Sequence, residues 1–297
     1  MKIGLVLAGG GARGAYQIGV WKALIELGID KYINAVSGTS IGALNAVMFM
    51  EGQYELAEQF WLNVTKEQIL PECQKNFGIK SLLFGLGARN MEFVRKYIPK
   101  AIKGGTISRE GIDEIFERID FNLVRDSKIK GYATCTRIPE LKPEYFVINE
   151  KSTDDIKKIL LASTALPIIY GSEGINDIDY VDGGVIDNVP IQPLYGEGCN
   201  IIIVVQLSKE TLIDKSRFPN TYIIEIVANE PELIDVKDML DFDLPIIKKR
   251  MSKGYMDTIY MIKPIMELTN IINNKESYDI KGNSITEKFK KIFNKGK

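Results

Sequence analysis

Histidine is absent from all 297 residues of the sequence. This absence excludes a Ser-His-Asp catalytic triad. It also removes the histidine ligands on which most catalytic zinc sites depend, so we expect no metal site. If a serine acts as a nucleophile in this chain, a side chain other than histidine must accept its proton.

Cysteine is scarce, and neither charge sign predominates. Cys73, Cys135 and Cys199 are widely spaced, with no C-x-x-C pair. This pattern argues against a disulfide framework or a zinc site and is typical of a reducing compartment, so we expect a cytoplasmic location. The formal net charge is −1, so no overall basic field attracts nucleic acid. No apolar run reaches the roughly 18 residues of a membrane-spanning helix.

The sequence around Ser40 predicts a sharp turn from a strand to a helix. The apolar segment 33–36 precedes Gly38-Thr39-Ser40-Ile41-Gly42, and the helix-forming segment 43–50 follows it. In this context G-x-S-x-G is typical of a nucleophile elbow, whose turn exposes the serine hydroxyl. The helix start would place free N–H groups beside it. The alternative is a serine in a glycine turn that caps a helix.

A glycine-rich loop follows the first predicted strand. Residues 9–14 read Gly-Gly-Gly-Ala-Arg-Gly and match G-x-G-x-x-G, which is also the fingerprint of dinucleotide-binding folds. That fingerprint requires an acidic residue after the second strand, but Asp30 precedes the strand, which weakens this interpretation. A phosphate-binding P-loop is excluded because no Gly-Lys-Ser/Thr is present. The loop can instead cradle an anion with its backbone N–H groups, as an oxyanion hole does.

Strand-like and helix-like segments alternate along most of the chain. Segments 2–8, 33–36, 199–207 and 222–227 are typical of buried parallel strands. We therefore predict one three-layer α/β/α sandwich with a mainly parallel central sheet over residues 1–262. Residues 263–297 form a C-terminal extension. We also expect a single strand over 175–181 and a helix over 238–262, broken at Pro245.

The predicted 175–181 strand ends at Asp182-Gly183-Gly184. Because the carboxyl ends of parallel strands share one edge of a sheet, this aspartate, the glycine-rich loop and Ser40 can meet there. Taken alone, Asp182 is more typical of an ordinary turn aspartate before two glycines; beside the other motifs, the functional interpretation is favoured.

Together these motifs resemble the patatin-like phospholipase family. Residues 9–14 are similar to its oxyanion loop, residues 38–42 to its elbow, and residues 182–190 to its catalytic-aspartate block. Residues 162–167 resemble a further characteristic segment. The match covers roughly residues 1–205, and four blocks in the right order are far more specific than any one of them.

The resemblance implies a Ser-Asp dyad, which agrees with the missing histidines. It implies that Ser40 is the nucleophile and Asp182 the base. Backbone N–H groups of the oxyanion loop would stabilise the oxyanion; that loop comprises Gly9, Gly10, Gly11, Ala12, Arg13 and Gly14. The residues expected to support these motifs are Gly38, Gly42, Gly183, Gly184 and Asn188.

The activity implied is a lipid acyl hydrolase that cleaves phospholipids or lysophospholipids without metal or cofactor. Three alternatives stay open: a carboxylesterase or acyltransferase that prefers soluble esters, a nucleotide-binding oxidoreductase, and a catalytically idle lipid-binding scaffold. The oxidoreductase leaves the elbow and Asp182 unexplained.

Two segments have two interpretations each. An apolar patch within 79–86 is either ordinary core or a lip over an acyl-chain pocket. The C-terminal segment is either a terminal helix with solvated lysines or a basic amphipathic helix that contacts an anionic membrane at its inner surface. Its contact residues would be Ile285, Lys288, Phe289, Lys291, Ile292 and Phe293.

Overall fold

The computed structural model describes residues 1–69, 110–167, 170–209, 211–228 and 236–279. The chain divides into two compact units, Met1–Asp257 and Thr258–Lys297. The long helix α12, Leu244–Asp279, runs across the boundary between them. The domain boundary predicted at residue 262 stays a prediction, and the apolar patch at 79–86 and the segment 285–293 lie outside the described residues.

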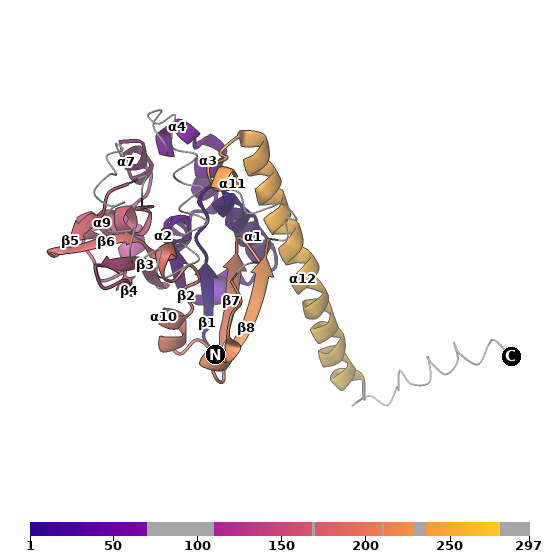
Figure 1. The fold of residues 1–297 in the computed structure, drawn as a ribbon. Helices are drawn as coiled ribbons and strands as arrows, with labels where there is room; N and C mark the ends of the chain where they lie inside the picture. The colour runs from indigo at the N-terminus through magenta and orange to yellow at the C-terminus, as the bar shows by residue number, and fades with distance from the viewer. Residues whose placement is uncertain (70–109, 168–169, 210, 229–235, 280–297) are drawn as a thin grey trace. The chain divides into compact units, whose positions relative to one another are not determined.

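The first unit is built on an eight-stranded sheet with the order β5-β6-β3-β2-β1-β7-β8, in which β4 also pairs with β3. Its five parallel strands run side by side in Figure 1. They are β1 (Ile3–Leu7), β2 (Ile33–Thr39), β3 (Lys130–Ile138), β7 (Ile201–Gln206) and β8 (Tyr222–Val227). β1 and β7 are apolar along nearly their whole length because both faces of the sheet are covered at the centre.

Three further strands join the sheet by antiparallel pairing around β3. They are β4 (Lys142–Val147), β5 (Glu173–Ile175) and β6 (Ile178–Asp182). The single strand predicted over 175–181 is wrong, because the chain turns back at Asn176 and Asp177 to form a β5–β6 hairpin. Both turn residues have positive φ, 50° and 61°, which asparagine and aspartate tolerate better than other non-glycine residues in two-residue hairpin turns.

β2 and β6 meet end to end along one edge of β3. Thr39, the last residue of β2, pairs with Thr134, and Asp182, the last residue of β6, pairs with the next residue, Cys135. β4 occupies the opposite edge of β3 over both stretches. The two strands run toward each other, so the residues at their ends face one another across the junction.

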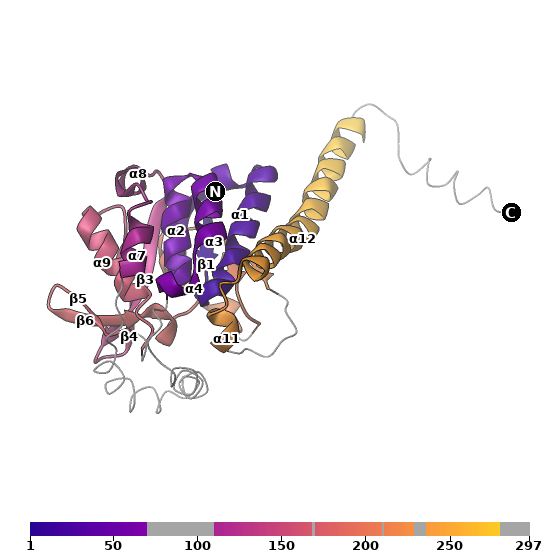
Figure 2. The same cartoon turned by 90° about the horizontal axis from the view of Figure 1, so that it is seen from above.

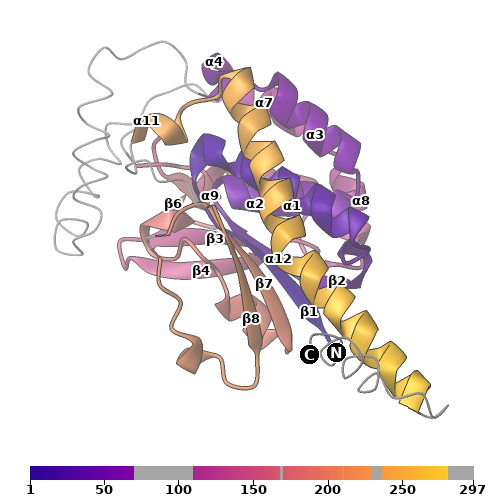
Figure 3. The same cartoon turned by 90° about the vertical axis from the view of Figure 1, so that its right-hand side faces the viewer.

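Helices cover the sheet on one face, as Figures 2 and 3 show. This layer includes α1 (Ala15–Glu26), α2 (Ile41–Glu51) and α3 (Tyr54–Asn63). The opposite face packs against the short helix α10 (Gln192–Gly196) and the loop before it, through Val6, Ala35, Leu194 and Val204 among others. The remaining helices are α4 (Lys66–Ile69), α7 (Glu110–Phe116), α8 (Phe121–Asp126), α9 (Thr153–Ser163) and α11 (Val236–Met239).

The mixed α/β fold with a mostly parallel central sheet is therefore confirmed. The predicted break at Pro245 is wrong, because α12 begins at Leu244 and Pro245 lies in its first turn, where a missing N–H costs no intrahelical bond. Among the described helices, none combines the length and the apolar character needed to cross a bilayer.

Candidate functional site

Ser40 lies in a strained turn between β2 and α2. Its backbone has φ 56° and ψ −127°, a conformation that non-glycine residues rarely adopt. A Cβ atom on Gly42 would lie 2.1 Å from the Leu7 carbonyl oxygen, and one on Gly38 would lie 2.1 Å from the Gly42 carbonyl oxygen. Only glycine fits at these two positions, so the pentapeptide forms the elbow predicted from the sequence.

The Ser40 hydroxyl contacts the carboxylate at the end of β6. Its Oγ donates a hydrogen bond of 2.6 Å to Asp182 Oδ2, and the Gly184 N–H donates one of 2.7 Å to Asp182 Oδ1. Ser40 is 8% exposed and Asp182 is 1% exposed. This juxtaposition follows from the end-to-end junction of β2 and β6, and it is the arrangement in which a carboxylate can take a proton from a hydroxyl.

The environment of Asp182 raises the affinity of its carboxyl for a proton. Burial raises the pKa of Asp182 to about 7, against the hydrogen bonds from Ser40 and Gly184, which lower it. An ordinary aspartate, with a pKa of about 3.9, is a weak base. A buried one with a pKa near neutrality both accepts and returns a proton at physiological pH.

The backbone of Asp182 is fixed by its neighbours. Its N–H donates to the Ala165 carbonyl at 3.0 Å, and its own carbonyl accepts from Thr136 Oγ1 at 3.0 Å. Ala165 belongs to the 162–167 segment noted in the sequence. That segment therefore contacts the backbone of Asp182 directly.

Ser163, from the same segment, supports the elbow and was not predicted to do so. Its Oγ accepts a 2.9 Å hydrogen bond from the Ser40 N–H and donates one of 2.7 Å to the Thr134 carbonyl. The side chain is fully buried. It ties the strained backbone of the elbow to β3, and only its place in the 162–167 block hinted at a role.

The glycine-rich loop begins where β1 ends and is held by Asn188. The Gly9 N–H donates to the Asn188 carbonyl, and Asn188 Nδ2 donates to the Gly9 carbonyl, both at 3.2 Å. The Arg13 N–H and Nε both donate to the Gly10 carbonyl at 3.3 Å. Asn188 thus anchors the start of the loop, and Arg13 closes its turn.

Three consecutive N–H groups of this loop have no acceptor. Among the residues that the structure describes, nothing accepts a hydrogen bond from the N–H groups of Gly10, Gly11 or Ala12. Gly14, the last glycine of the motif, is buried instead, where a Cβ would lie 2.8 Å from Ile41 Cγ1. The loop therefore presents a run of unpaired donors, as an anion-binding cradle does.

The 187–190 segment is hydrogen-bonded to β2 and to β4. Thr39 Oγ1 donates to the Asp187 carbonyl at 2.9 Å, and Ser37 Oγ donates to the Pro190 carbonyl at 2.6 Å. The Tyr145 hydroxyl donates to Asp187 Oδ2 at 2.6 Å. These bonds place Asn188 against Gly9.

A buried polar network supports the loop from the helical layer. Gln17 Nε2 donates to the Ala8 carbonyl at 2.7 Å, and Asn45 Nδ2 donates to the Gly14 carbonyl at 3.1 Å. Asn45 also accepts from Trp61 Nε1 at 2.9 Å and donates to Gln17 Oε1 at 2.7 Å. No role was predicted for these residues, although an asparagine inside the apolar 43–50 helix signals a buried hydrogen-bonded group.

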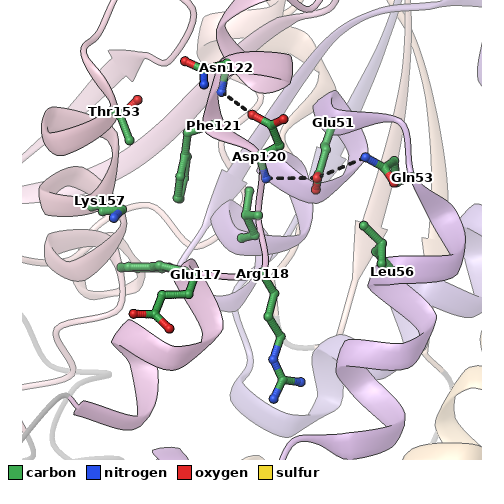
Figure 4. Close-up of a pocket in the computed structure, with 12 residues that line it drawn as sticks. Glu51, Gln53, Leu56, Glu117, Arg118, Asp120, Phe121, Asn122, Thr153 and Lys157 are labelled. Carbon is green, nitrogen blue, oxygen red and sulfur yellow. Dashed lines mark hydrogen bonds between the residues drawn. The ribbon is translucent and has the colours of Figure 1, made fainter.

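Other features lie apart from this constellation. A pocket of about 470 Å³ opens at the far end of α2 (Figure 4). α2 has 11 residues, so at about 1.5 Å per residue this end lies about 16 Å from Ser40. Charges of both signs line the pocket, with Glu51, Glu117, Arg118, Asp120 and Lys157 among them.

Across the described part of the chain, no three histidine, cysteine or acidic side chains cluster so that they could hold a metal ion.

The sequence is similar to known proteins of one family. The family model for patatin-like phospholipase matches residues 5–195. Lysophospholipase NTE1 of Cryptococcus neoformans is 32% identical over 206 residues, covering 69% of this chain and 11% of that protein. Lysophospholipase nte1 of Aspergillus terreus is 27% identical over 205 residues, covering 69% of this chain and 12% of that protein. The chain thus spans about an eighth of these relatives' length.

One solved structure has a similar fold. VipD from Legionella pneumophila superposes with a TM-score of 0.53 at 13% sequence identity, over 89% of this chain and 67% of that one. The family model spans well over half of the sequence and includes the elbow, the glycine-rich loop and Asp182. The resemblance noted in the sequence is thereby confirmed: this chain belongs to the patatin-like phospholipase family.

Proposed function

We propose that the chain is a lipid acyl hydrolase that cleaves carboxylic ester bonds of phospholipids or lysophospholipids through Ser40 and Asp182. The observation that carries the proposal is the 2.6 Å hydrogen bond from the Ser40 hydroxyl to the buried Asp182 carboxylate, at a strained elbow in a chain of this family. The curated relatives with lysophospholipase in their names support the substrate class.

In the acylation half of the reaction, Ser40 Oγ attacks the ester carbonyl carbon and its proton passes to Asp182 Oδ2. The C–O double bond opens, and negative charge collects on the carbonyl oxygen. The unpaired N–H groups of Gly10, Gly11 and Ala12 stabilise that charge, at roughly 3–4 kcal/mol for each effective donor. The Gly9 and Arg13 N–H groups already have acceptors, so we assign no oxyanion contact to them.

Collapse of the tetrahedral intermediate breaks the bond to the leaving alcohol, which takes the proton from Asp182. A water molecule then attacks the acyl-enzyme while Asp182 accepts its proton. The acid leaves, and the proton returns to Ser40 Oγ. Each half-reaction uses the carboxylate once as base and once as acid, a role to which a pKa of about 7 is well matched.

The test compares fatty-acid release from mixed phospholipid and lysophospholipid vesicles by the wild type, Ser40→Ala and Asp182→Asn. Ser252→Ala, an exposed serine on α12, is the matched control. We expect release by the wild type and the control. Both site variants should lose at least about 10³-fold in kcat, as enzymes do when a nucleophile or its base is removed. Circular dichroism would verify that each variant is folded.

Full activity in folded Ser40→Ala would contradict the assignment of the nucleophile. Wild-type release from short soluble esters but not from vesicles would instead favour the carboxylesterase alternative. The predicted cytoplasmic location, the absence of a nucleic-acid partner and a peripheral membrane contact through the C-terminal segment stay predictions.

A further inference from the structure

A short segment beyond the family-matched region packs on the glycine-rich loop. We call residues 238–242 the wall segment; it comprises the end of α11 and the residues that follow. A Cβ atom on Gly11 would lie 2.2 Å from the Met239 carbonyl oxygen, so the two backbones are in direct contact. Gly11 has φ +57°, which a side chain would strain further. The loop thus rests against the wall segment midway along its run of unpaired N–H groups.

Arg250 of α12 holds the wall segment in place. Its Nη1 donates to the Asp241 carbonyl at 2.8 Å and its Nη2 to the Asp238 carbonyl at 2.9 Å. Nη2 also lies 3.8 Å from the Asp238 carboxylate, and the arginine side chain is only 4% exposed. A planar guanidinium makes both backbone bonds at once, whereas a lysine ammonium offers a single point of charge.

The part of α12 that carries Arg250 is itself held close to the loop. The first turns of α12 pack directly on α1, the helix that starts where the glycine-rich loop ends. A Cβ atom on Gly19 would lie 1.8 Å from the Met251 carbonyl oxygen, and one on Gly254 would lie 2.0 Å from the Tyr16 carbonyl oxygen. Arg250 therefore connects two elements that adjoin the loop: α1, which follows the loop in the chain, and the wall segment, which contacts Gly11.

Phe242 links the wall segment to the polar network under the loop. It is 6% exposed, and its ring stacks on Trp61 with centroids 6.4 Å apart and planes 14° apart. Trp61 in turn donates to Asn45, which donates to the Gly14 carbonyl. The wall segment thus contacts the loop directly through Met239 and indirectly through Phe242.

We infer that Arg250 is a positioning residue: through the wall segment it keeps the Gly10–Ala12 N–H groups aimed at the developing oxyanion. This inference rests on the proposed function and adds to it a residue outside the matched span of 5–195. Among the described residues, Arg250 makes no hydrogen bond or ion pair with Ser40 or Asp182. Its influence on the reaction is therefore expected to pass through backbone placement alone.

The experiment uses Arg250→Lys, with the exposed neighbour Lys249→Met as matched control, in the full chain. We expect kcat on a lysophospholipid to fall about 10- to 100-fold, less than the 10²–10³-fold lost when an oxyanion donor is removed outright. KM should stay within about twofold, because the effect is confined to the transition state. Native-state amide exchange should accelerate at Gly9 and Arg13, whose N–H groups are bonded in the loop, but not at Val6 in β1.

Wild-type kcat in folded Arg250→Lys, or a rise in KM alone, would overturn the inference. If Arg250→Lys does not fold, Phe242→Leu perturbs the same segment without altering a buried cation. It should show the same fall in kcat with an unchanged KM, and wild-type kcat and exchange in it would overturn the inference. Amide exchange requires no activity. If the wild type fails to hydrolyse any ester, the proposed function fails while the exchange data still decide whether Arg250 orders the loop.

Discussion

At the scale of single residues, the site depends on a buried carboxylate that is costly to ionise. Asp182 is 1% exposed, and the described structure gives it no cationic partner, only the Ser40 hydroxyl and the Gly184 N–H. Burial without a counter-charge favours the protonated form. The feature that would make this aspartate a useful base in the proposed reaction therefore also destabilises the folded state at alkaline pH.

The free energy of unfolding should therefore depend on pH through Asp182. The folded-state pKa of Asp182 is about 7, above that of an unfolded aspartate. Between about pH 4 and pH 7 the folded state holds a proton that the unfolded state has lost, so stability falls as pH rises through this window. The full effect is about 4 kcal/mol at 1.36 kcal/mol for each tenfold change. Asp182→Asn should abolish this component.

Urea unfolding of the wild type and Asp182→Asn at pH 5 and pH 8 measures it. We expect the variant to gain stability relative to the wild type at pH 8 and to keep less than half of that advantage at pH 5. A constant difference between the two proteins at both pH values would show that Asp182 carries no elevated pKa in the folded state.

Ser40 and Asp182 could be singled out as candidates from the sequence because their signals are local. Glycines at 38 and 42 and an apolar segment before them describe an elbow, and Asp182 precedes two glycines at a strand end. Ser163 and Arg250 carry no such signal. The Ser163 hydroxyl accepts from the N–H of Ser40, which is 123 residues away, and Arg250 donates to carbonyls 9 and 12 residues before it, across the start of α12. Nothing in the neighbouring residues records either contact.

At the scale of secondary-structure elements, the elbow helix α2 and the α3 helix are joined to the loop by polar bonds inside an apolar layer. Trp61 of α3 is fully buried and donates to Asn45 of α2. Removing one member of such a buried pair leaves the other without a partner, which costs about 1–3 kcal/mol beyond the loss of packing.

Trp61→Phe should therefore destabilise the protein more than Trp21→Phe. Trp21 is also buried and packs against Phe49 and Tyr54, but no described residue accepts a hydrogen bond from its indole N–H. We expect the free energy of unfolding to differ by about 1–2 kcal/mol between the two variants. Equal losses in chemical denaturation would mean that the Asn45 bond contributes nothing measurable.

The helices and strands were predicted correctly where apolar residues recur regularly. They were predicted incorrectly where the conformation of a few turn residues sets the boundary of an element. The buried parallel strands and the helices α1 and α2 follow from long apolar patterns. The β5–β6 hairpin was missed because its two turn residues, Asn176 and Asp177, sit inside a short apolar stretch. Pro245 was read as a breaker although a proline in the first turn of a helix is tolerated.

At the scale of the whole molecule, the family-matched span is smaller than the structural unit. β1, which leads into the glycine-rich loop, pairs on one side with β2 and on the other with β7, which starts at Ile201. Strand β7, strand β8 and the start of α12 all lie beyond residue 195. The central sheet is therefore completed by sequence that the family model does not cover.

A chain ending at residue 195 should fail to fold as a soluble monomer. Its β1 would become an edge strand with an apolar, unpaired backbone, which promotes association between chains. A chain ending at residue 279 keeps every described element and is the control. Size-exclusion chromatography and circular dichroism would compare them, and a monomeric, folded 1–195 chain would refute the dependence on β7.

The meeting of β2 and β6 along β3 has a consequence for how sequence variation can act on this site. The pairs Thr39–Thr134 and Cys135–Asp182 place the ends of these two strands one residue apart on a third strand. The distance between the Ser40 hydroxyl and the Asp182 carboxylate therefore depends on the residue spacing of β3, which is about 3.3 Å per residue. β3 itself supplies neither group. Substituting side chains of β3 leaves this backbone spacing unchanged. An inserted residue between 134 and 135 would move Ser40 and Asp182 apart, and a deleted residue would make the ends of β2 and β6 clash. For this site, the count of residues in β3 is under a tighter constraint than their identity.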